Sequence, residues 1–458
     1  MVKLNQLFFY LLAAVILPFF ASCSDNDDNN DNNKSNEDKV EVEIPDLDFS
    51  KSMDAVRQSE TARGFEVVAD GSYKLNATKK VNSQTITLSY FFDPSTTEYR
   101  YAKGTYDTDK ERNAVLKKLA ESGFAAADSA NGVSFYKNAT TNIEVAFYDE
   151  KKAFYALPNS EDPLAWGRFD YLTDKDKAGL IVPYLGKYAT GELITLAEQY
   201  HGNHLNKVTS NEATGVYVFD VTDTTKGYTE IRYWLDQKTK SQLEEAAIYF
   251  DEDKRPTTDE IATYMNYLGL KYTSLKDASD GSQIYFNYQK KFVAYLSMDK
   301  PEDTDTVFAP NIHFTFNDLS AQMPPETVTI PEPITDFNTM TLNEAVEKYK
   351  KLPYYTGTED DGFGGALGII VTTSSPDFPK ILLMEDSGKY LAAFLLPNNA
   401  MTLRSPSIKD WLTEKGYEYN AKASILPTYI SKDNKVMAQF DIDGAIAGMP
   451  CLVFQPKE

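Results

Sequence analysis

The chain is poor in the residues that carry most enzymatic and metal chemistry. Its 458 residues include only two cysteines and three histidines. Two cysteines exclude a disulfide framework and a cysteine-rich zinc site. The Gly-X-Ser-X-Gly and His-Glu-X-X-His patterns of hydrolases are also absent. We therefore expect a protein that is not an enzyme and that holds neither a metal nor another cofactor.

Positive charge is also scarce. The sequence has 46 Lys and Arg against 68 Asp and Glu, which gives a formal net charge of −22. A field of this sign repels nucleic acid and anionic lipid headgroups, so we expect no nucleic-acid partner. Apolar residues, at 42% of the chain with 13% aromatic, are nevertheless sufficient for several hydrophobic cores.

Long apolar runs are confined to the N-terminus. Residues 1–22 read MVKLNQLFFYLLAAVILPFFAS, with one Lys near the start, a short apolar run and then small residues. This order is typical of an export signal rather than a membrane span. Ala21, Ser22 and Cys23 resemble a bacterial lipobox, and the resemblance implies that Cys23 is acylated and begins the mature protein. The alternative is a plain secretory signal with an incidental cysteine.

A strongly polar stretch follows Cys23. Ser24 to Asp38 reads SDNDDNNDNNKSNED, which is too charged to bury any surface and predicts a solvated tether. A lipidated cysteine followed at once by an acidic run resembles the surface-exposed outer-membrane lipoproteins of the Bacteroidota. The resemblance implies a chain anchored in the outer membrane through Cys23 and exposed at the cell surface.

One amphipathic helical pattern occurs three times in the remaining sequence. Its copies are Thr108–Phe124, Thr257–Leu270 and Ser405–Tyr417, and the glycines near their ends, Gly123, Gly269 and Gly416, are 146 and 147 residues apart. Each copy has one apolar stripe, and the glycine fits a left-handed helix end. The regular interval predicts tandem repeats; three unrelated domains with a similar rhythm are the alternative.

Local signals around these helices predict the fold of each repeat. Thr108 with Glu111, and Thr257 with Glu260, fit a capping box, while Ser405 precedes Pro406 at the start of the third copy. Alternating apolar strands precede and follow each helix, in the order helix, three strands, helix, three strands. We expect an α+β fold of three tandem repeats of about 146 residues, each an antiparallel sheet with helices packed on one face.

The predicted organisation has six segments. They are a signal peptide at 1–22, an acidic flexible tether at 23–44, repeat 1 at 45–172, repeat 2 at 183–318, a Pro-rich linker at 319–334 and repeat 3 at 335–458. A third capping box, Thr341 with Glu344, is expected to start repeat 3.

Repeat 3 contains the largest departure from its sister copies. Its run GFGGALG begins at Gly362 and follows Glu359, Asp360 and Asp361. The run lacks the Lys-Ser/Thr of a phosphate loop and precedes a strand, so a turn is the better interpretation. Because a functional site is expected where one copy differs, we predict a contact surface at Glu359, Asp360, Asp361, Gly362, Phe363 and Gly364.

Tryptophans and histidines are the remaining candidates. Trp166 and Trp234 lie within or next to predicted strands, where packing in the core or on the sheet is the favoured interpretation and stacking on a sugar is the alternative. His201 and His204 could share a metal with Glu198, but they are better explained as residues of a turn after a helix. His313 is expected on the outward face of a strand, and Cys451 inside one.

These observations favour a non-enzymatic, surface-exposed lipoprotein that acts as a binding or accessory subunit of an outer-membrane protein complex. Three copies without an obvious active site suit a chain that presents surface to a partner. The alternative is a glycan-binding lipoprotein of a nutrient-uptake system. A hydrolase with a pair of carboxylates in one repeat is the third hypothesis.

Overall fold

The structure is a computed structural model that describes residues 40–81, 84–158, 179–222, 227–299, 309–360, 368–421, 426–444 and 448–457. The chain divides into two compact units, Met1–Glu41 and Val42–Glu458, and every described helix and strand lies in the second. No helix among these residues is long and apolar enough to cross a membrane.

Repeat 1 forms the first eight-stranded antiparallel sheet, sheet 1, in the order β1-β2-β3-β4-β8-β7-β6-β5. Its elements are α2 (Met53–Ala62), β1 (Glu66–Ala69), β2 (Lys74–Val81), β3 (Gln84–Phe92), β4 (Tyr99–Thr105), α3 (Asp109–Glu121), β5 (Ala125–Ala130), β6 (Val133–Asn138), β7 (Ile143–Tyr148), η1 (Asp149–Lys151) and β8 (Ala153–Pro158).

Repeat 2 forms sheet 2 in the corresponding order, β9-β10-β11-β12-β16-β15-β14-β13. Its elements are α5 (Gly191–Tyr200), β9 (His204–Leu205), η3 (Glu212–Thr214), β10 (Val216–Asp220), β11 (Tyr228–Leu235), β12 (Leu243–Phe250), η5 (Glu252–Lys254), α6 (Thr258–Tyr267), β13 (Lys271–Lys276), β14 (Gln283–Asn287), β15 (Phe292–Ser297) and β16 (Asn311–Thr315). The short η6 (Ser320–Gln322) follows.

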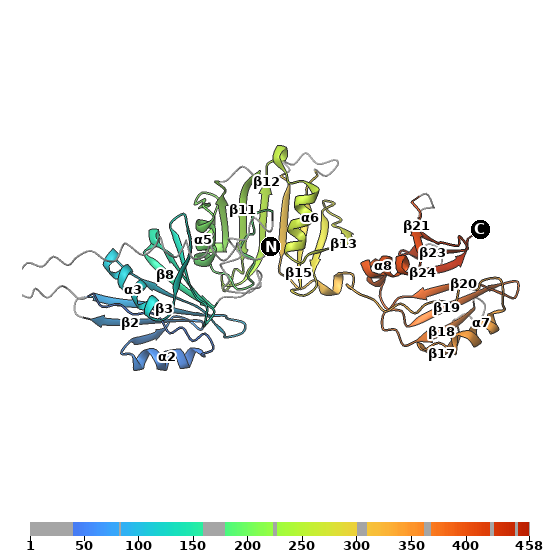
Figure 1. Ribbon diagram of the computed structural model, residues 1–458, viewed down its shortest axis with the longest axis horizontal. Coiled ribbons are helices and arrows are strands. Elements are labelled where there is room, and N and C mark those ends of the chain that lie inside the picture. The colour runs from blue at the N-terminus through green and yellow to red at the C-terminus, as the bar shows by residue number, and fades with distance from the viewer. Residues whose placement is uncertain are drawn as a thin grey trace, which may run out of the picture. The chain divides into compact units, whose positions relative to one another are not determined.

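Repeat 3 forms sheet 3, β17-β18-β19-β20-β24-β23-β22-β21, again with the same connectivity. Its elements are α7 (Leu342–Tyr349), β17 (Tyr355–Asp360), β18 (Gly368–Thr373), β19 (Lys380–Asp386), β20 (Lys389–Leu396), η7 (Ala400–Arg404), α8 (Pro406–Glu414), β21 (Tyr417–Tyr419), β22 (Thr428–Ser431), β23 (Val436–Asp441) and β24 (Cys451–Pro456). Figure 1 shows the three sheets in successive colours along the chain.

The predicted α+β class and the three similar units are confirmed, but each half-repeat has four strands rather than three. The additional strands include the sheet edges β1 and β5. The sequence of β5, AAADSA, is almost entirely exposed and shows no apolar alternation. Such a strand forms because β6 offers it backbone partners, which a local pattern does not reveal.

The helices begin and end as the sequence predicts. Thr108, Thr257 and Thr341 each form a complete capping box with the glutamate three residues later. Gly123 and Gly269 have φ values of +87° and +65°, the left-handed conformation expected after a helix. Ser405 is the exception, because its side chain makes no capping hydrogen bond and contacts Ser407 instead.

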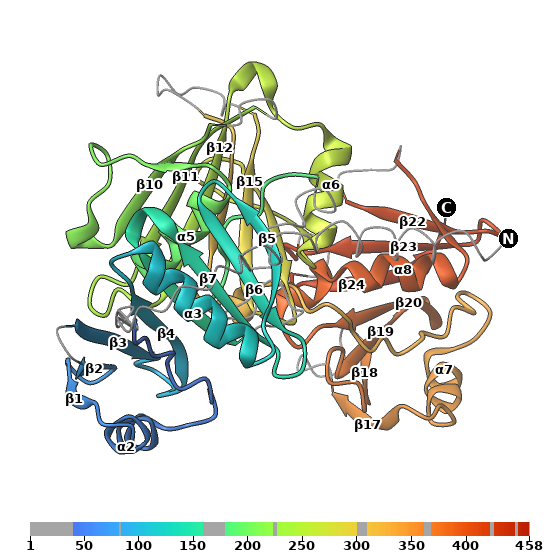
Figure 2. The same cartoon turned by 60° about the vertical axis from the view of Figure 1, so that its left-hand side comes forward.

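Each sheet buries one face against its own two helices. In repeat 1, Val56 of α2 and Leu119 of α3 pack on a core that includes Leu88 and Phe154. In repeat 3, α7 and α8 pack in the same way on strands β18 to β24, and Figure 2 shows α8 beside β24 and α7 beside β17 and β18. The face turned away from these helices is called the outer face below.

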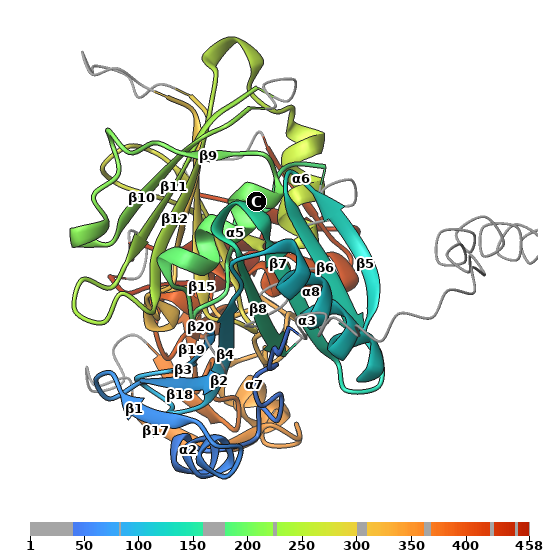
Figure 3. The same cartoon turned by 90° about the vertical axis from the view of Figure 1, so that its left-hand side faces the viewer.

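The outer face of sheet 1 packs against helix α5 of repeat 2. Side chains from both repeats form one continuous hydrophobic cluster. The Phe135 and Tyr200 rings are 5.0 Å apart, Asn131 donates to the Tyr200 carbonyl at 2.9 Å, and Tyr148 donates to Gln199 at 3.2 Å. Repeats 1 and 2 therefore share a core, with α5 contacting both sheets (Figure 3).

The position eight residues after the N-cap of the first helix has a shared role in the three repeats. It is Glu60, Glu198 and Tyr349, and each is completely buried. Glu60 and Glu198 accept hydrogen bonds from Tyr90 and Tyr233, which come from the corresponding strands β3 and β11. The repeats thus preserve a contact between this helix and its sheet that their sequences do not display.

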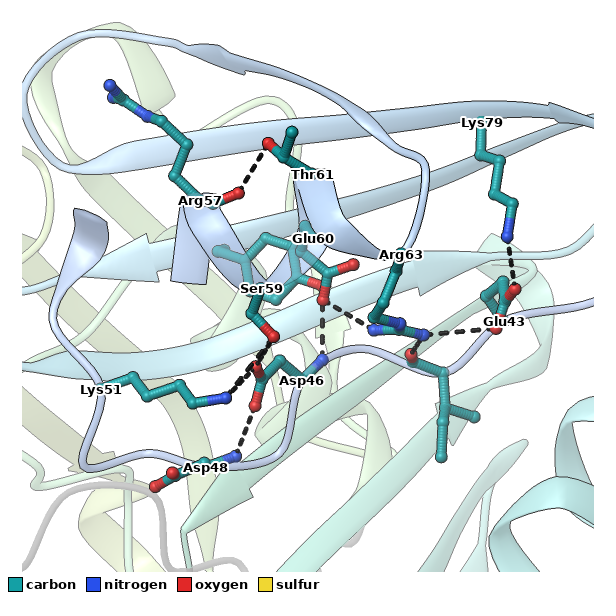
Figure 4. Close-up of polar contacts among 12 residues, drawn as sticks. Glu43, Asp46, Asp48, Lys51, Arg57, Ser59, Glu60, Thr61, Arg63 and Lys79 are labelled. Carbon is teal, nitrogen blue, oxygen red and sulfur yellow. Dashed lines mark hydrogen bonds and ion pairs between the residues drawn. The ribbon is translucent and has the colours of Figure 1, made fainter. Parts of the chain in front are cut away.

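In repeat 1 this contact also fixes the segment that precedes α2 (Figure 4). Glu60 accepts from Tyr90 at 2.6 Å and pairs with Arg63 at 2.7 Å. Arg63 in turn donates to the Ile44 carbonyl at 2.7 Å and pairs with Glu43 at 3.3 Å. The chain is therefore held from Glu43 onward by a partly buried ionic network.

Asp46 makes a second set of contacts in the same segment. Ser59 of α2 donates to its carboxylate at 2.6 Å, and Lys51 forms an ion pair with it. Burial disfavours the charge, but the hydrogen bonds from Lys51 and Ser59 outweigh burial and lower the pKa of Asp46. Tyr99 donates to the Asp46 carbonyl at 2.8 Å. We call Glu43, Asp46 and these partners the N-terminal latch.

Candidate functional site

Several predicted site residues lie outside the described residues. They are Cys23, Trp166, Asp361, Gly362, Phe363 and Gly364. Glu359 and Asp360 end the edge strand β17, where Glu359 pairs with Lys380 of β19 at 2.6 Å. The later glycine Gly368 has a structural role, because a Cβ there would lie 1.9 Å from the Leu383 carbonyl oxygen.

The histidine and cysteine candidates are dispersed. His201 ends helix α5, and His204 lies in the two-residue edge strand β9. Cys451 is fully buried, and burial raises the pKa of its thiol to about 12, which disfavours the reactive thiolate. Among the described ranges, no three His, Cys, Asp or Glu residues are close enough to hold a metal ion.

Trp234 lies in a cluster of aromatic and charged side chains on the outer face of sheet 2. Strand alternation places Ile231, Tyr233 and Leu235 against the helices, so their neighbours Arg232 and Trp234 lie on the opposite face. We call this cluster the sheet 2 platform; its members are Arg232 and Trp234 on β11, Glu245 and Tyr249 on β12, Tyr295 on β15, and His313 on β16.

The platform is organised around His313. The Trp234 and His313 rings stack at a centroid distance of 5.6 Å, and Tyr295 meets His313 edge-on at 6.4 Å. The His313 Nε2 atom is 2.9 Å from Glu245, and the two side chains are 34% and 38% exposed. Further along the paired strands β11 and β12, the Arg232 guanidinium lies 4.9 Å from the centre of the Tyr249 ring.

The acidic side chains beside the platform each contact a ring or a cation on it. The hydrogen bond from His313 is the main cause that lowers the pKa of Glu245, and burial opposes it. Glu230 forms an ion pair with Arg232, and its hydrogen bond raises the pKa of the guanidinium. The result is a half-exposed surface whose rings and charges are already fixed by one another.

The corresponding outer faces of the other sheets differ. Part of this face of sheet 1 is covered by α5 of repeat 2. Sheet 3 has an apolar cluster there, with Leu382, Phe394, Cys451 and Val453 buried on its central strands. Among the described outer faces, that of sheet 2 is the one that carries a Trp ring stacked on a histidine bonded to a glutamate. The predicted departure of repeat 3 around Glu359 lies at a sheet edge instead.

Sequence reasoning found Trp234 but missed its neighbours. His313 is 79 residues away in the sequence, and only the pairing of β12 with both β11 and β16 brings the two rings together. The outward position of His313 follows from its alternation with Ile312 and Phe314, but nothing local identifies the strand beside it.

Comparison with known proteins does not identify a relative. No protein-family model matches the sequence, and no curated protein matches it significantly.

Proposed function

We propose that this chain is a non-enzymatic, surface-exposed outer-membrane lipoprotein that binds a partner protein as an accessory subunit of an outer-membrane complex. The observation that supports the proposal most directly is the sheet 2 platform. Trp, Tyr and Arg are the residues that contribute most to protein interfaces. Here Trp234, Tyr249, Tyr295 and Arg232 occur together on one sheet face.

The geometry also limits the cost of binding. Side chains that are free in the unbound protein lose rotamer entropy when a partner fixes them. Trp234 is already stacked on His313, and His313 is bonded to Glu245. A partner would therefore meet a surface that is largely in its bound arrangement, with paired charges at its margins.

In this proposal Cys23 supplies the membrane anchor. Acyl chains bind the membrane with about 0.8 kcal/mol per buried methylene, so two or three chains hold the protein firmly. The roughly 20 residues between Cys23 and Val42 can span at most about 65 Å. The folded unit can therefore meet a partner that projects from the same membrane.

The experiment is a crosslinked pull-down of the full-length protein from its native outer membrane. We expect one outer-membrane protein to be recovered in stoichiometric amount with the wild type. Trp234→Ala should reduce recovery strongly, because loss of an interface tryptophan costs about 2–4 kcal/mol, or roughly 30- to 1000-fold in affinity.

Tyr419→Ala is the matched control. Tyr419 is a 62% exposed aromatic on edge strand β21 of repeat 3, outside the platform. It should leave recovery unchanged. Equal recovery with Trp234→Ala and wild type would reject the platform as the docking surface. A monomer that retains oligosaccharide and no protein would reject the accessory-subunit role in favour of glycan capture.

A further inference from the structure

A groove distinct from the platform lies where repeats 1 and 2 meet. Its larger cavity, of about 550 Å³, lies between Phe91, Tyr101 and Tyr155 of sheet 1 and the start of α5 with Tyr217 of repeat 2. A second cavity of about 300 Å³ shares Phe91, Lys103, Thr105 and Glu192 with the first. The shared residues make the two cavities one continuous site, which we call the inter-repeat groove.

The walls of the groove are rigid. Phe91 and Tyr101 are a cross-strand pair whose rings stack at 4.1 Å with an interplanar angle of 5°. Tyr101 is 1% exposed, and its hydroxyl is 3.4 Å from the Thr190 hydroxyl across the repeat boundary. Because repeats 1 and 2 share one core, both walls are held by the same packing. The groove is therefore preformed, as ligand sites usually are.

The lining combines ring surfaces with hydroxyl groups. Phe91 supplies a half-buried aromatic surface with the Lys74 ammonium 5.5 Å from its centre, and hydroxyls line the two cavities at Thr87, Ser89, Thr105 and Thr195. The hydroxyls of Ser89 and Thr195 already donate to Asn76 and to the Gly191 carbonyl, so these two can only accept from a ligand. A hydroxyl both donates and accepts hydrogen bonds, which matches the hydroxyls of a sugar. Two adjoining cavities of about 550 and 300 Å³ have room for more than one sugar ring.

The lining of the groove has more basic than acidic side chains, whereas the whole protein has a negative net charge. Four lysines line it, namely Lys74, Lys103, Lys151 and Lys207, against two acids, Glu192 and Glu212. Lys103 pairs with Glu192, and Lys74 pairs with Asp70 at 2.8 Å. Lys151 and Lys207 form no ion pair with any residue in the described ranges. Glu212 is likewise in no described ion pair, so the two lysines exceed the unpaired acids of the lining by one charge. In a chain with a net charge of −22, a local excess of positive charge at a groove favours an anionic ligand.

Helix α5 adds to this positive potential. Gly191 and Glu192, the first two residues of the helix, line the groove. The side chain of Thr190 caps the N–H of Leu193 and leaves the two preceding N–H groups without a described acceptor. The start of a helix carries a partial positive charge, which favours a carboxylate or sulfate nearby.

We propose that the inter-repeat groove binds an acidic oligosaccharide, with sugar rings against Phe91 and negatively charged substituents near Lys151 and Lys207. The ring surface and hydroxyls select a sugar chain, while the lysines and the helix start select its charge. This site is separate from the sheet 2 platform, so it would operate whether or not the platform binds a protein.

The test uses calorimetric titration of the full-length protein in detergent with tetragalacturonate and its fully methyl-esterified form. The two probes have the same rings and linkages and differ only in charge. We expect the acid to bind at least tenfold more tightly than the ester, and its affinity to fall with added salt. Lys207→Ala and Lys151→Ala should each weaken binding of the acid several-fold and leave the ester unchanged.

Lys409→Ala is the control, because Lys409 is an exposed lysine of α8 in repeat 3. It should not alter binding. Equal affinity for acid and ester would overturn the role assigned to the lysines, and no binding of either probe would overturn the site. A sulfated tetrasaccharide that binds like the uronate would show that the groove reads negative charge on a sugar chain from either source. Inorganic phosphate that binds as tightly as the uronate would exclude a role for the sugar rings.

Discussion

Replacement of Glu198 by Gln should stabilise the protein at alkaline pH and have little effect at acidic pH. Glu198 is fully buried in α5 and accepts hydrogen bonds from Tyr233 and from Asn203, the latter at 2.6 Å. Burial raises its pKa to about 7, while the two hydrogen bonds act in the opposite direction. The folded protein therefore holds a proton on this carboxyl at pH values where the unfolded chain has released it.

The sign of the pH dependence follows from this difference. Because the folded pKa is above the unfolded value of about 4.5, the free energy of unfolding falls as pH rises through this window and levels off above about 7. One pKa unit corresponds to about 1.4 kcal/mol. From pH 5 to pH 8.5 this carboxyl should lower the free energy of unfolding of the wild type by about 2–3 kcal/mol. An amide at the same position does not titrate and should cause no such fall.

The measurement is urea unfolding of wild type and Glu198→Gln at both pH values. From pH 5 to pH 8.5 the variant should gain about 2–3 kcal/mol of unfolding free energy relative to the wild type. Any fixed cost of imperfect amide hydrogen bonding cancels in this comparison. A difference that stays constant with pH would refute the reasoning.

Glu60→Gln is the matched contrast. Glu60 occupies the same helix position in repeat 1 but pairs with Arg63 at 2.7 Å. Removal of its charge leaves the guanidinium with one ionic partner fewer inside the N-terminal latch. We expect this variant to be less stable than wild type near neutral pH by about 1–3 kcal/mol, in the opposite direction to Glu198→Gln.

Three further predictions concern stability, and each is measured by chemical denaturation. Tyr264→Phe should stabilise the protein by about 1 kcal/mol, because the buried Tyr264 hydroxyl has no hydrogen-bond partner among the described residues; a loss of stability would contradict this. Thr341→Ala should cost about 1 kcal/mol, since it removes the capping box with Glu344, whereas Thr341→Ser should not. Gly104→Ala should cost about 1–3 kcal/mol, because a Cβ would lie 2.2 Å from the Phe154 ring; a neutral effect would show that this core can repack.

The sequence predicts the features that depend on neighbouring residues. The three capping boxes and the left-handed glycines at helix ends are local, and the structure contains them as expected. The strand count was wrong because β5 and β1 are largely exposed edges without a clear apolar period. Their pairing partners, rather than their own side chains, determine that they are strands.

The candidate sites show the same limit more strongly. Trp234 was identifiable as a tryptophan in a strand, but its contact with His313 depends on the order of strands in sheet 2. The inter-repeat groove could not be predicted, because it requires the start of α5 to lie near β3, β4 and β8 of the preceding repeat. Strand order and the docking of one repeat on another are long-range features that no local pattern encodes.

The N-terminal latch has a mechanical consequence. If Cys23 is acylated as proposed, any pull between membrane and protein enters the folded unit at Val42. The first bonds to carry the load are those from Arg63 to Glu43 and to the Ile44 carbonyl. The next are the hydrogen bonds from Ser59 and Tyr99 to Asp46. These bonds join the leading segment to both α2 and β4, so the force is shared between a helix and a central strand. A pull on an acylated Cys23 would therefore load α2 and β4 together before it frayed the end of the chain.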